Sequence, residues 1–251
     1  MTVPARVVIL DWGIGGLPLA HALREASPGA DLLYISDRAS PPYGRLGRSD
    51  LAQRIMTLLQ SVEADLVALA CNAASAVLEE LIVSGPVEGI IEHGIRAALE
   101  RDVATLGVLG GDRVTEDGSY STPLREHGLQ VRSSSGQRLS ALVERGQIDG
   151  PEVCTAVAAA LAPLQETDAI LLACTHYPAL AAVIERHAPR TPLIDPTPAM
   201  ARAIVERYHL SQALGAGDLH VRTTGCPAEM RRAASIAFGL SVRPQRLTIA
   251  P

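Results

Sequence analysis

The stretch DLVALACN at residues 65–72 recurs along the chain as DAILLACT at residues 168–175. Each copy reads as a buried strand that begins at an Asp, delivers a cysteine and a small polar residue, and leads into an Ala-rich helix. A weaker echo relates residues 7–16 to residues 106–113. Any two buried strands share an apolar run, but the matched Asp and Cys favour an internal repeat. We therefore predict two similar α/β lobes, each with one cysteine at a strand end.

Short apolar runs alternate with longer helical patterns throughout, which is typical of parallel sheets covered by helices. Most runs end just before Gly, Asn, Thr or Asp, where an α/β sheet presents its ligand-binding edge. We expect residues 1–94 and 203–251 to form one lobe and residues 95–202 the other, because cysteines that face each other must belong to different lobes. The expected strands are residues 6–10, 31–35, 65–70, 87–91, 105–109, 129–132, 169–173 and 192–194.

Length and charge restrict the class of protein. The 251 residues allow one large domain or two modest ones, and 47% hydrophobic with 20% charged residues is a globular profile. The formal charge of -5 is spread without a basic block, so nucleic acid is not expected as a partner. No apolar run approaches the roughly 20 residues that span a bilayer, and no signal-type segment opens the chain. We expect a cytoplasmic protein with no membrane partner.

Residue types exclude several mechanisms. All 22 basic residues are Arg, so this chain cannot supply the lysine that a pyridoxal phosphate enzyme or a P-loop needs. Cys71, Cys154, Cys174 and Cys226 are far apart and include no C-x-x-C, which predicts free thiols rather than a disulfide framework or zinc ribbon. Cys71 and Cys174 with His176 offer no ligand pair at metal spacing, so we expect no metal.

The two strand-end thiols suggest proton chemistry. A thiol at such a position, close to a helix N-terminus, sits where backbone N–H groups and the helix dipole stabilise a thiolate. If the lobes close on a ligand, Cys71 and Cys174 lie on its opposite faces, as needed to remove a proton from one side of a carbon and deliver another from the other. Either cysteine alone is more often a small core residue. Cys154, in an Ala-rich helix, and Cys226, in a turn, are expected to be structural.

Three further polar residues have both a chemical and a structural interpretation. Asp11 ends the first strand and could order a substrate ammonium or polarise Cys71, or it could cap a helix. His176 could share a proton with Cys174 or lie at the surface where a helix starts. Glu144 ends a helical stretch and is either a supporting carboxylate or a solvated end group.

These motifs resemble those of the glutamate racemases in the aspartate/glutamate racemase superfamily, and the resemblance covers nearly the whole chain. The Cys-Thr-His-Tyr-Pro block together with Ala-Cys-Asn is quite specific. The similar segments are DWGIGGL at residues 11–17, PYG at 42–44, ACNA at 70–73, ACTHYP at 173–178, and residues 96–99 and 223–225.

The resemblance implies two α/β lobes with parallel sheets and pseudo-two-fold symmetry, the active site between them, and two-base racemisation of a small amino acid without cofactor or metal. Homodimerisation is left open. By the same resemblance, Cys71 and Cys174 are the proton donor and acceptor. They are assisted by Asp11, His176 and Glu144, and the polar groups of the substrate are held by Tyr43, Gly44, Asn72 and Thr175.

Three substrate-binding positions depart from the family pattern. Trp12 stands where the family has Ser, Ala73 where it has Thr, and Gly111 where it has the Thr of a Gly-Thr pair. The first two would ordinarily present hydroxyls to the substrate, and Trp12 adds a large apolar surface. Glutamate is the default substrate, but Trp12 and Ala73 favour one that is bulkier or less polar.

Two other classes of function remain open. A superfamily relative could use the same cleft as a decarboxylase or isomerase of another carboxylic acid, although two intact cysteines disfavour single-cysteine versions. A non-catalytic binding or regulatory protein could also keep this fold. Proton exchange at Cα in deuterium oxide separates racemisation from both.

Overall fold

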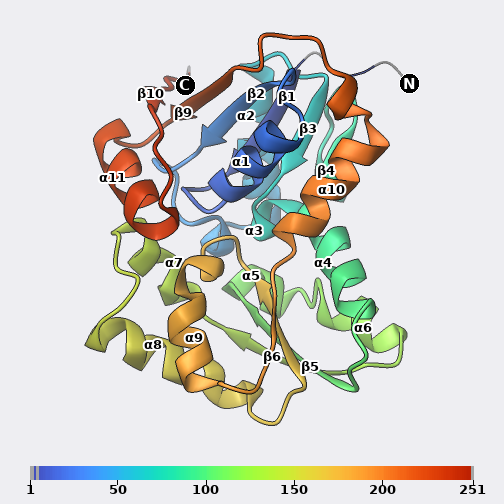
Figure 1. Cartoon of the computed structure of the whole chain (residues 1–251), viewed down its shortest axis with the longest axis vertical. Coiled ribbons are helices and arrows are strands. Elements are labelled where there is room, and N and C mark those ends of the chain that lie inside the picture. The colour runs from blue at the N-terminus through green and yellow to red at the C-terminus, as the bar shows by residue number, and fades with distance from the viewer. Residues whose placement is uncertain (1–2, 4–5, 250–251) are drawn as a thin grey trace.

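The computed structural model describes residue 3 and residues 6–249, and its strands form two parallel sheets (Figure 1). The first has the order β10-β9-β2-β1-β3-β4 and the second the order β6-β5-β7-β8. The strands are β1 (Arg6–Asp11), β2 (Asp31–Ser36), β3 (Leu66–Leu69), β4 (Val87–Gly89), β5 (Thr105–Gly110), β6 (Gln130–Ser135), β7 (Ala169–Ala173), β8 (Leu193–Ile194), β9 (Leu219–Thr223) and β10 (Gln245–Arg246).

The strands of the second sheet, β5 to β8, lie between β4 and β9 in the sequence, so the second lobe is an insertion in the first. The boundaries expected at residues 94/95 and 203 fall inside α4 (Ile90–Leu99) and α10 (Thr197–Arg207), two helices that pack against each other. These lobe boundaries stay a prediction. The helices are α1 (Leu17–Ala26), α2 (Arg48–Gln60), α3 (Asn72–Ser75), α4 (Ile90–Leu99), α5 (Asp112–Glu116), α6 (Ser121–Glu126), α7 (Gln137–Glu144), α8 (Pro151–Leu161), α9 (Ala181–His187), α10 (Thr197–Arg207) and α11 (Pro227–Phe238), with short 3-10 turns that include η1 (Tyr43–Arg45) and η4 (Tyr177–Leu180).

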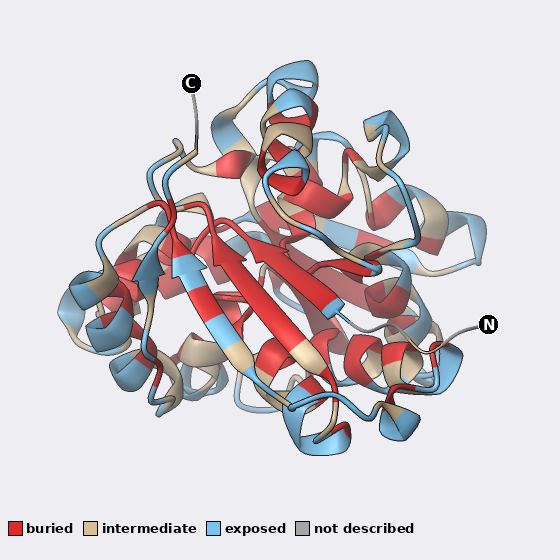
Figure 2. Cartoon of the chain, turned by 90° about the horizontal axis from the view of Figure 1, so that it is seen from above, coloured by how far each residue is buried: buried red, intermediate tan, exposed pale blue. Residues whose placement is uncertain are grey.

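Helices cover both faces of the first sheet because its central strand is apolar on both sides. In β1, Val7 and Ile9 join a core cluster with α1 and α10, while Val8 and Leu10 join a second cluster with α2. This alternation follows from the two-residue period of a strand. The central strands β1, β2 and β3 are accordingly almost wholly buried, whereas β9 and β10 at one edge of the sheet carry exposed residues, as do the surrounding helices (Figure 2).

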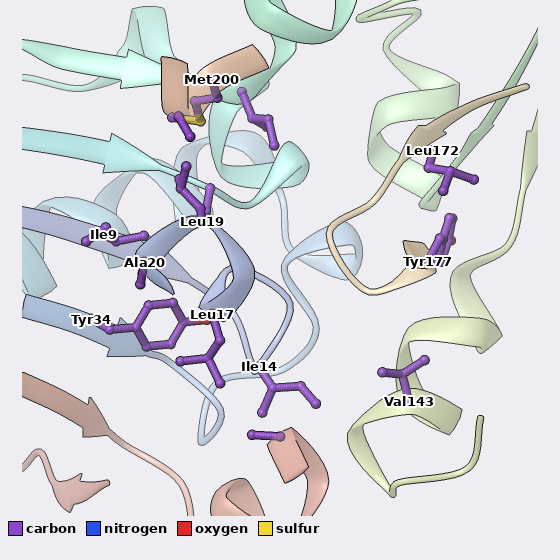
Figure 3. Close-up of a cluster of buried hydrophobic side chains, with 14 of the residues drawn as sticks. Ile9, Ile14, Leu17, Leu19, Ala20, Tyr34, Val143, Leu172, Tyr177 and Met200 are labelled. Carbon is purple, nitrogen blue, oxygen red and sulfur yellow. The ribbon is translucent and has the colours of Figure 1, made fainter. Parts of the chain in front are cut away.

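One hydrophobic cluster passes from the first lobe into the second. Ile14, in the loop after β1, belongs to the same cluster as Val143 of α7 and Leu172 of β7 (Figure 3). The lobes are therefore joined by apolar packing behind the cleft as well as by polar contacts within it.

The fold class predicted from the sequence is confirmed, with three differences in its strands. Residues 90–91, expected in a strand, begin α4, because the N–H of Ile90 donates to Oγ of Ser75 and leaves the sheet. The strand expected to end at residue 132 continues to Ser135, since its serines pair with β5. β9 and β10 were missed, because β9 mixes exposed and buried residues and β10 is only two residues long.

Candidate active site

Cys71 and Cys174 occupy corresponding places in the two sheets. Cys71 lies just beyond β3 as the N-cap residue of α3, and Cys174 directly follows β7. Both line one pocket formed by the two lobes, where Cys71 is buried and Cys174 is half-buried. The same pocket is lined by six of the predicted substrate-binding residues: Trp12, Tyr43, Gly44, Asn72, Ala73 and Thr175.

The pocket is small. Its cavity volume is about 40 Å³.

The surroundings of Cys71 keep its sulfur protonated. Burial raises the pKa of the thiol, and the nearby charge of Asp11 raises it further. Backbone N–H groups of Ala73 and Ala74 oppose this, but they do not compensate for burial. The thiolate stabilisation expected from the helix N-terminus is therefore outweighed at this cysteine, where α3 is only four residues long.

A series of polar contacts runs from Cys174 through His176 to Glu144, all three in the second lobe. Nδ1 of His176 lies 3.7 Å from the sulfur of Cys174, and Nε2 lies 2.7 Å from Oε1 of Glu144. Burial opposes the charge on His176, but hydrogen bonds with Cys174 and Glu144 raise its pKa well above the ordinary value of 6.5. Burial likewise opposes the charge on Glu144, and the bond to His176 nevertheless lowers its pKa. This series of contacts therefore stabilises an imidazolium beside Cys174.

Glu144 and Asp11 also tie the lobes together. Glu144 accepts a hydrogen bond of 2.7 Å from the N–H of Ile14 and one of 3.1 Å from Nε of Arg38, both in the first lobe. Asp11 is fully buried and accepts hydrogen bonds of 2.9 Å from the N–H of Gly13 and from Oγ1 of Thr175 in the second lobe. Burial raises the pKa of Asp11. Neither carboxylate lines the pocket, but each is hydrogen-bonded to a residue that does, Asp11 to Thr175 and Glu144 to His176.

Trp12 belongs to the core and to the pocket wall at once. Its side chain is 4% exposed, and the indole N–H donates to the carbonyl of Ser40 at 3.0 Å. The guanidinium of Arg38 stacks 4.5 Å over the ring, whose centre lies 6.0 Å from that of His176. The indole therefore holds Arg38 next to Glu144 while it also limits the width of the pocket.

The side chains of Tyr43 and Asn72 are held by buried hydrogen-bond partners. The hydroxyl of Tyr43 donates to Asp37 at 2.9 Å, and Asp37 also accepts hydrogen bonds from Arg54 and Thr224. Oδ1 of Asn72 accepts a hydrogen bond of 2.7 Å from the hydroxyl of Tyr120. The phenol of Tyr43 is thus held as a rigid wall.

Sequence reasoning missed several residues at the site. Arg113, Gln137 and Ser140 line the pocket, and Arg38 reaches Glu144. Arg113 and Arg38 each follow the end of an expected strand, so the rule that singled out the cysteines could also have found them. By contrast, Cys154 lies half-buried in α8 and Cys226 is exposed before α11, both outside this pocket.

The described part of the chain lacks two further kinds of feature. In residue 3 and residues 6–249, no group of three or more His, Cys, Asp or Glu side chains is placed to hold a metal ion. None of the helices in these ranges combines the length and apolarity needed to cross a membrane.

These features define a two-lobed α/β protein that brings a cysteine from each lobe to one cleft. The sequence profile of the Asp/Glu/Hydantoin racemase family matches residues 19–204. The glutamate racemase of Aquifex aeolicus is 31% identical over 248 residues, covering 96% of each chain. That of Exiguobacterium sibiricum is 34% identical over 257 residues, covering 96% of this chain and 95% of the relative. The chain belongs to this racemase family and is an isomerase of the racemase class.

Solved structures agree with this assignment. A glutamate racemase isoform of Bacillus anthracis superimposes with a TM-score of 0.86 at 26% identity, covering 98% of both chains. The glutamate racemase of Thermus thermophilus, solved in complex with beta-chloro-D-alanine, gives a TM-score of 0.83 at 28% identity, covering 98% of this chain and 97% of that one. The similarity extends over both lobes.

Proposed function

We propose that this protein racemises an amino acid without a cofactor, with Cys71 and Cys174 as the two acid–base groups. The observation that carries the proposal is that the two cysteines come from different lobes, line one pocket and have unlike surroundings. Burial and Asp11 favour a protonated Cys71, while Cys174 faces the imidazole of His176.

In one direction, the thiolate of Cys174 takes the proton from Cα, and the Cα–H electron pair stays on the substrate as a carbanion. The thiol of Cys71 then delivers its proton to the opposite face of Cα, which leaves a thiolate on Cys71 and a thiol on Cys174. The reverse direction restores the starting state. Asp11 raises the pKa of Cys71, and His176, held by Glu144, assists Cys174 from a distance of 3.7 Å between Nδ1 and the sulfur.

Tyr43, Gly44, Asn72 and Thr175 are proposed to bind the substrate, with Trp12 and Ala73 shaping the pocket in place of hydroxyl donors. A glutamate racemase of Francisella tularensis was solved in complex with D-glutamate, which keeps glutamate as the first substrate to test. A cytoplasmic location stays a prediction from the sequence.

The test is to incubate the full chain with single amino acids in deuterium oxide, following loss of the Cα proton by NMR and inversion by chiral chromatography. A racemase shows both, a decarboxylase releases carbon dioxide, and a binding protein shows neither. Cys71→Ser and Cys174→Ser should each abolish racemisation, with exchange from one face surviving. Cys226→Ser, at an exposed cysteine outside the pocket, is the matched control. Unchanged racemisation in Cys71→Ser would refute the assignment.

A further inference from the structure

Two buried nitrogen donors in the candidate active site have no hydrogen-bond partner among the described residues. They are Nδ2 of Asn72 and Nε of Arg113, which come from different lobes. Both residues line the pocket that Cys71 and Cys174 share. Because native proteins rarely leave a buried donor unpaired, a pair of such donors in one pocket marks the place of an acceptor on a ligand.

Arg113 is held at the edge of this pocket where the lobes meet. It lies on α5, and one of its terminal nitrogens donates to the carbonyl of Leu46 in the first lobe. The other lies 3.4 Å from Asp117, whose carboxylate is also bound by Arg48. The two terminal nitrogens are therefore held by partners outside the pocket, the side chain is only 11% exposed, and Nε has no hydrogen-bond partner among the described residues.

The carboxylate that pairs with Arg113, that of Asp117 at 3.4 Å, lies outside the pocket wall. Among the described residues that line the pocket there is no carboxylate, and Arg113 is the one guanidinium. The other group that carries positive charge, His176, already bonds to Glu144. Ala73, Gly111 and Val114 line the pocket without offering a side-chain donor. An anionic group on the ligand therefore finds its strongest partner at Arg113.

The position of Arg113 points to the substrate's side chain rather than to its α-carboxylate. Asn72 and Thr175 each directly follow a proposed catalytic cysteine and so lie next to the groups on Cα. Arg113 is on a different element from either cysteine, and its anchors, Leu46 and Asp117, do not line the pocket. A group farther along the substrate is the one that reaches it.

We propose that Arg113 is a specificity-determining residue that binds a carboxylate on the side chain of the substrate. This rests on the proposed function, and it selects an acidic amino acid. The less polar substrate favoured by Trp12 and Ala73 was inferred without Arg113, which supplies a charged donor in the same pocket.

The test compares binding of glutamate and of glutamine, which share their shape and differ in side-chain charge, by calorimetry of the full chain and its variants. In Arg113→Gln, the Kd for glutamate should rise by about tenfold or more, because one charge-assisted bond is lost, while the Kd for glutamine should change by less than about threefold. Arg113→Lys keeps the positive charge but lacks the planar guanidinium, which can bind a carboxylate through two N–H groups. Glutamate affinity should therefore fall to an intermediate value. Arg48→Gln is the matched control: it also removes a guanidinium bound to Asp117, but Arg48 does not line the pocket, and glutamate affinity should be unchanged.

Selective loss of glutamate affinity in Arg113→Gln, with an unchanged circular dichroism spectrum, supports the proposal. It does so even when no deuterium enters Cα in the wild type. That combination would reject racemisation but keep the specificity role. Equal weakening for both amino acids, no weakening for either, or failure of the wild type to bind glutamate would overturn it.

Discussion

Oε1 of Glu144 lies 2.7 Å from Nε2 of His176, and both side chains are buried. The pair is thus a buried ion pair whose carboxylate also accepts hydrogen bonds from Ile14 and Arg38 of the other lobe. The stability of the protein therefore depends on the charge of this pair, because Glu144 raises the pKa of His176 and His176 lowers that of Glu144.

Glu144→Gln should lower the free energy of unfolding by about 3 kcal/mol, because it leaves a buried imidazole without its counter-charge. Because the pKa of His176 is raised in the folded state, protonated His176 stabilises the fold. This stabilisation is complete below pH 6.5 and is lost as the pH rises through the pKa of His176 in the folded protein. The lowered pKa of Glu144 contributes above pH 4.5, and this is lost as pH falls. The difference between wild type and variant should therefore be largest between pH 4.5 and 6.5 in urea unfolding. Glu92→Gln, in an exposed pair with Arg96, should leave the pH dependence unchanged, and an equal change in both variants would contradict a role for the buried pair.

Asp11→Asn should make Cys71 more reactive. Burial is the main cause of the raised pKa of Cys71, and the charge of Asp11 is the second, so removal of that charge lowers the pKa in part. The measurement is the pH dependence of iodoacetamide alkylation of Cys71 in a Cys174→Ser background. The alkylation profile should move to lower pH, and slower alkylation in Asp11→Asn would show that the carboxylate acts otherwise.

Gly15→Ala should damage catalysis more than folding. A Cβ at this position would collide with Oγ1 of Thr175 and lie 2.9 Å from Nδ1 of His176, so residues of the second lobe must shift. A displacement of about 1 Å at reacting groups costs about 100-fold in rate. We expect kcat/KM for the best substrate to fall by about that factor with little change in Tm. In Gly47→Ala the added Cβ approaches only the flexible side chain of Asp50, and its activity should be retained.

Ala73→Thr should improve the handling of glutamate. Ala73 lines the pocket beside Asn72 and is half-buried, so a threonine hydroxyl there can reach a bound carboxylate. One added hydrogen bond is worth about 1 kcal/mol, or roughly fivefold in kcat/KM. Trp12→Ser is a poorer test, since it also removes a buried indole and the stacking of Arg38. No gain in Ala73→Thr would show that Asn72 and backbone groups already satisfy the substrate.

The sequence revealed the features that repeat locally and missed those that depend on packing between lobes. The strand before Cys71 and the strand before Cys174 share a pattern, so the two lobes and their cysteines could be predicted. The bonds from Glu144 to Ile14 and Arg38 join residues more than a hundred positions apart, and no periodicity indicates which arginine pairs with which carboxylate. For the same reason the unpaired Nε of Arg113 is visible only when its surroundings are known.

The interruption of the first sheet by the second lobe sets an order for assembly on the ribosome. A nascent chain that has reached α10 contains all four strands of the second sheet but only β1 to β4 of the six-stranded one. β9, which pairs with β2, is synthesised afterwards. Because domains generally fold as units during synthesis, the second lobe can be complete while β2 still has a free edge that invites pairing with another chain. The lobe that begins the chain is thus the last to close.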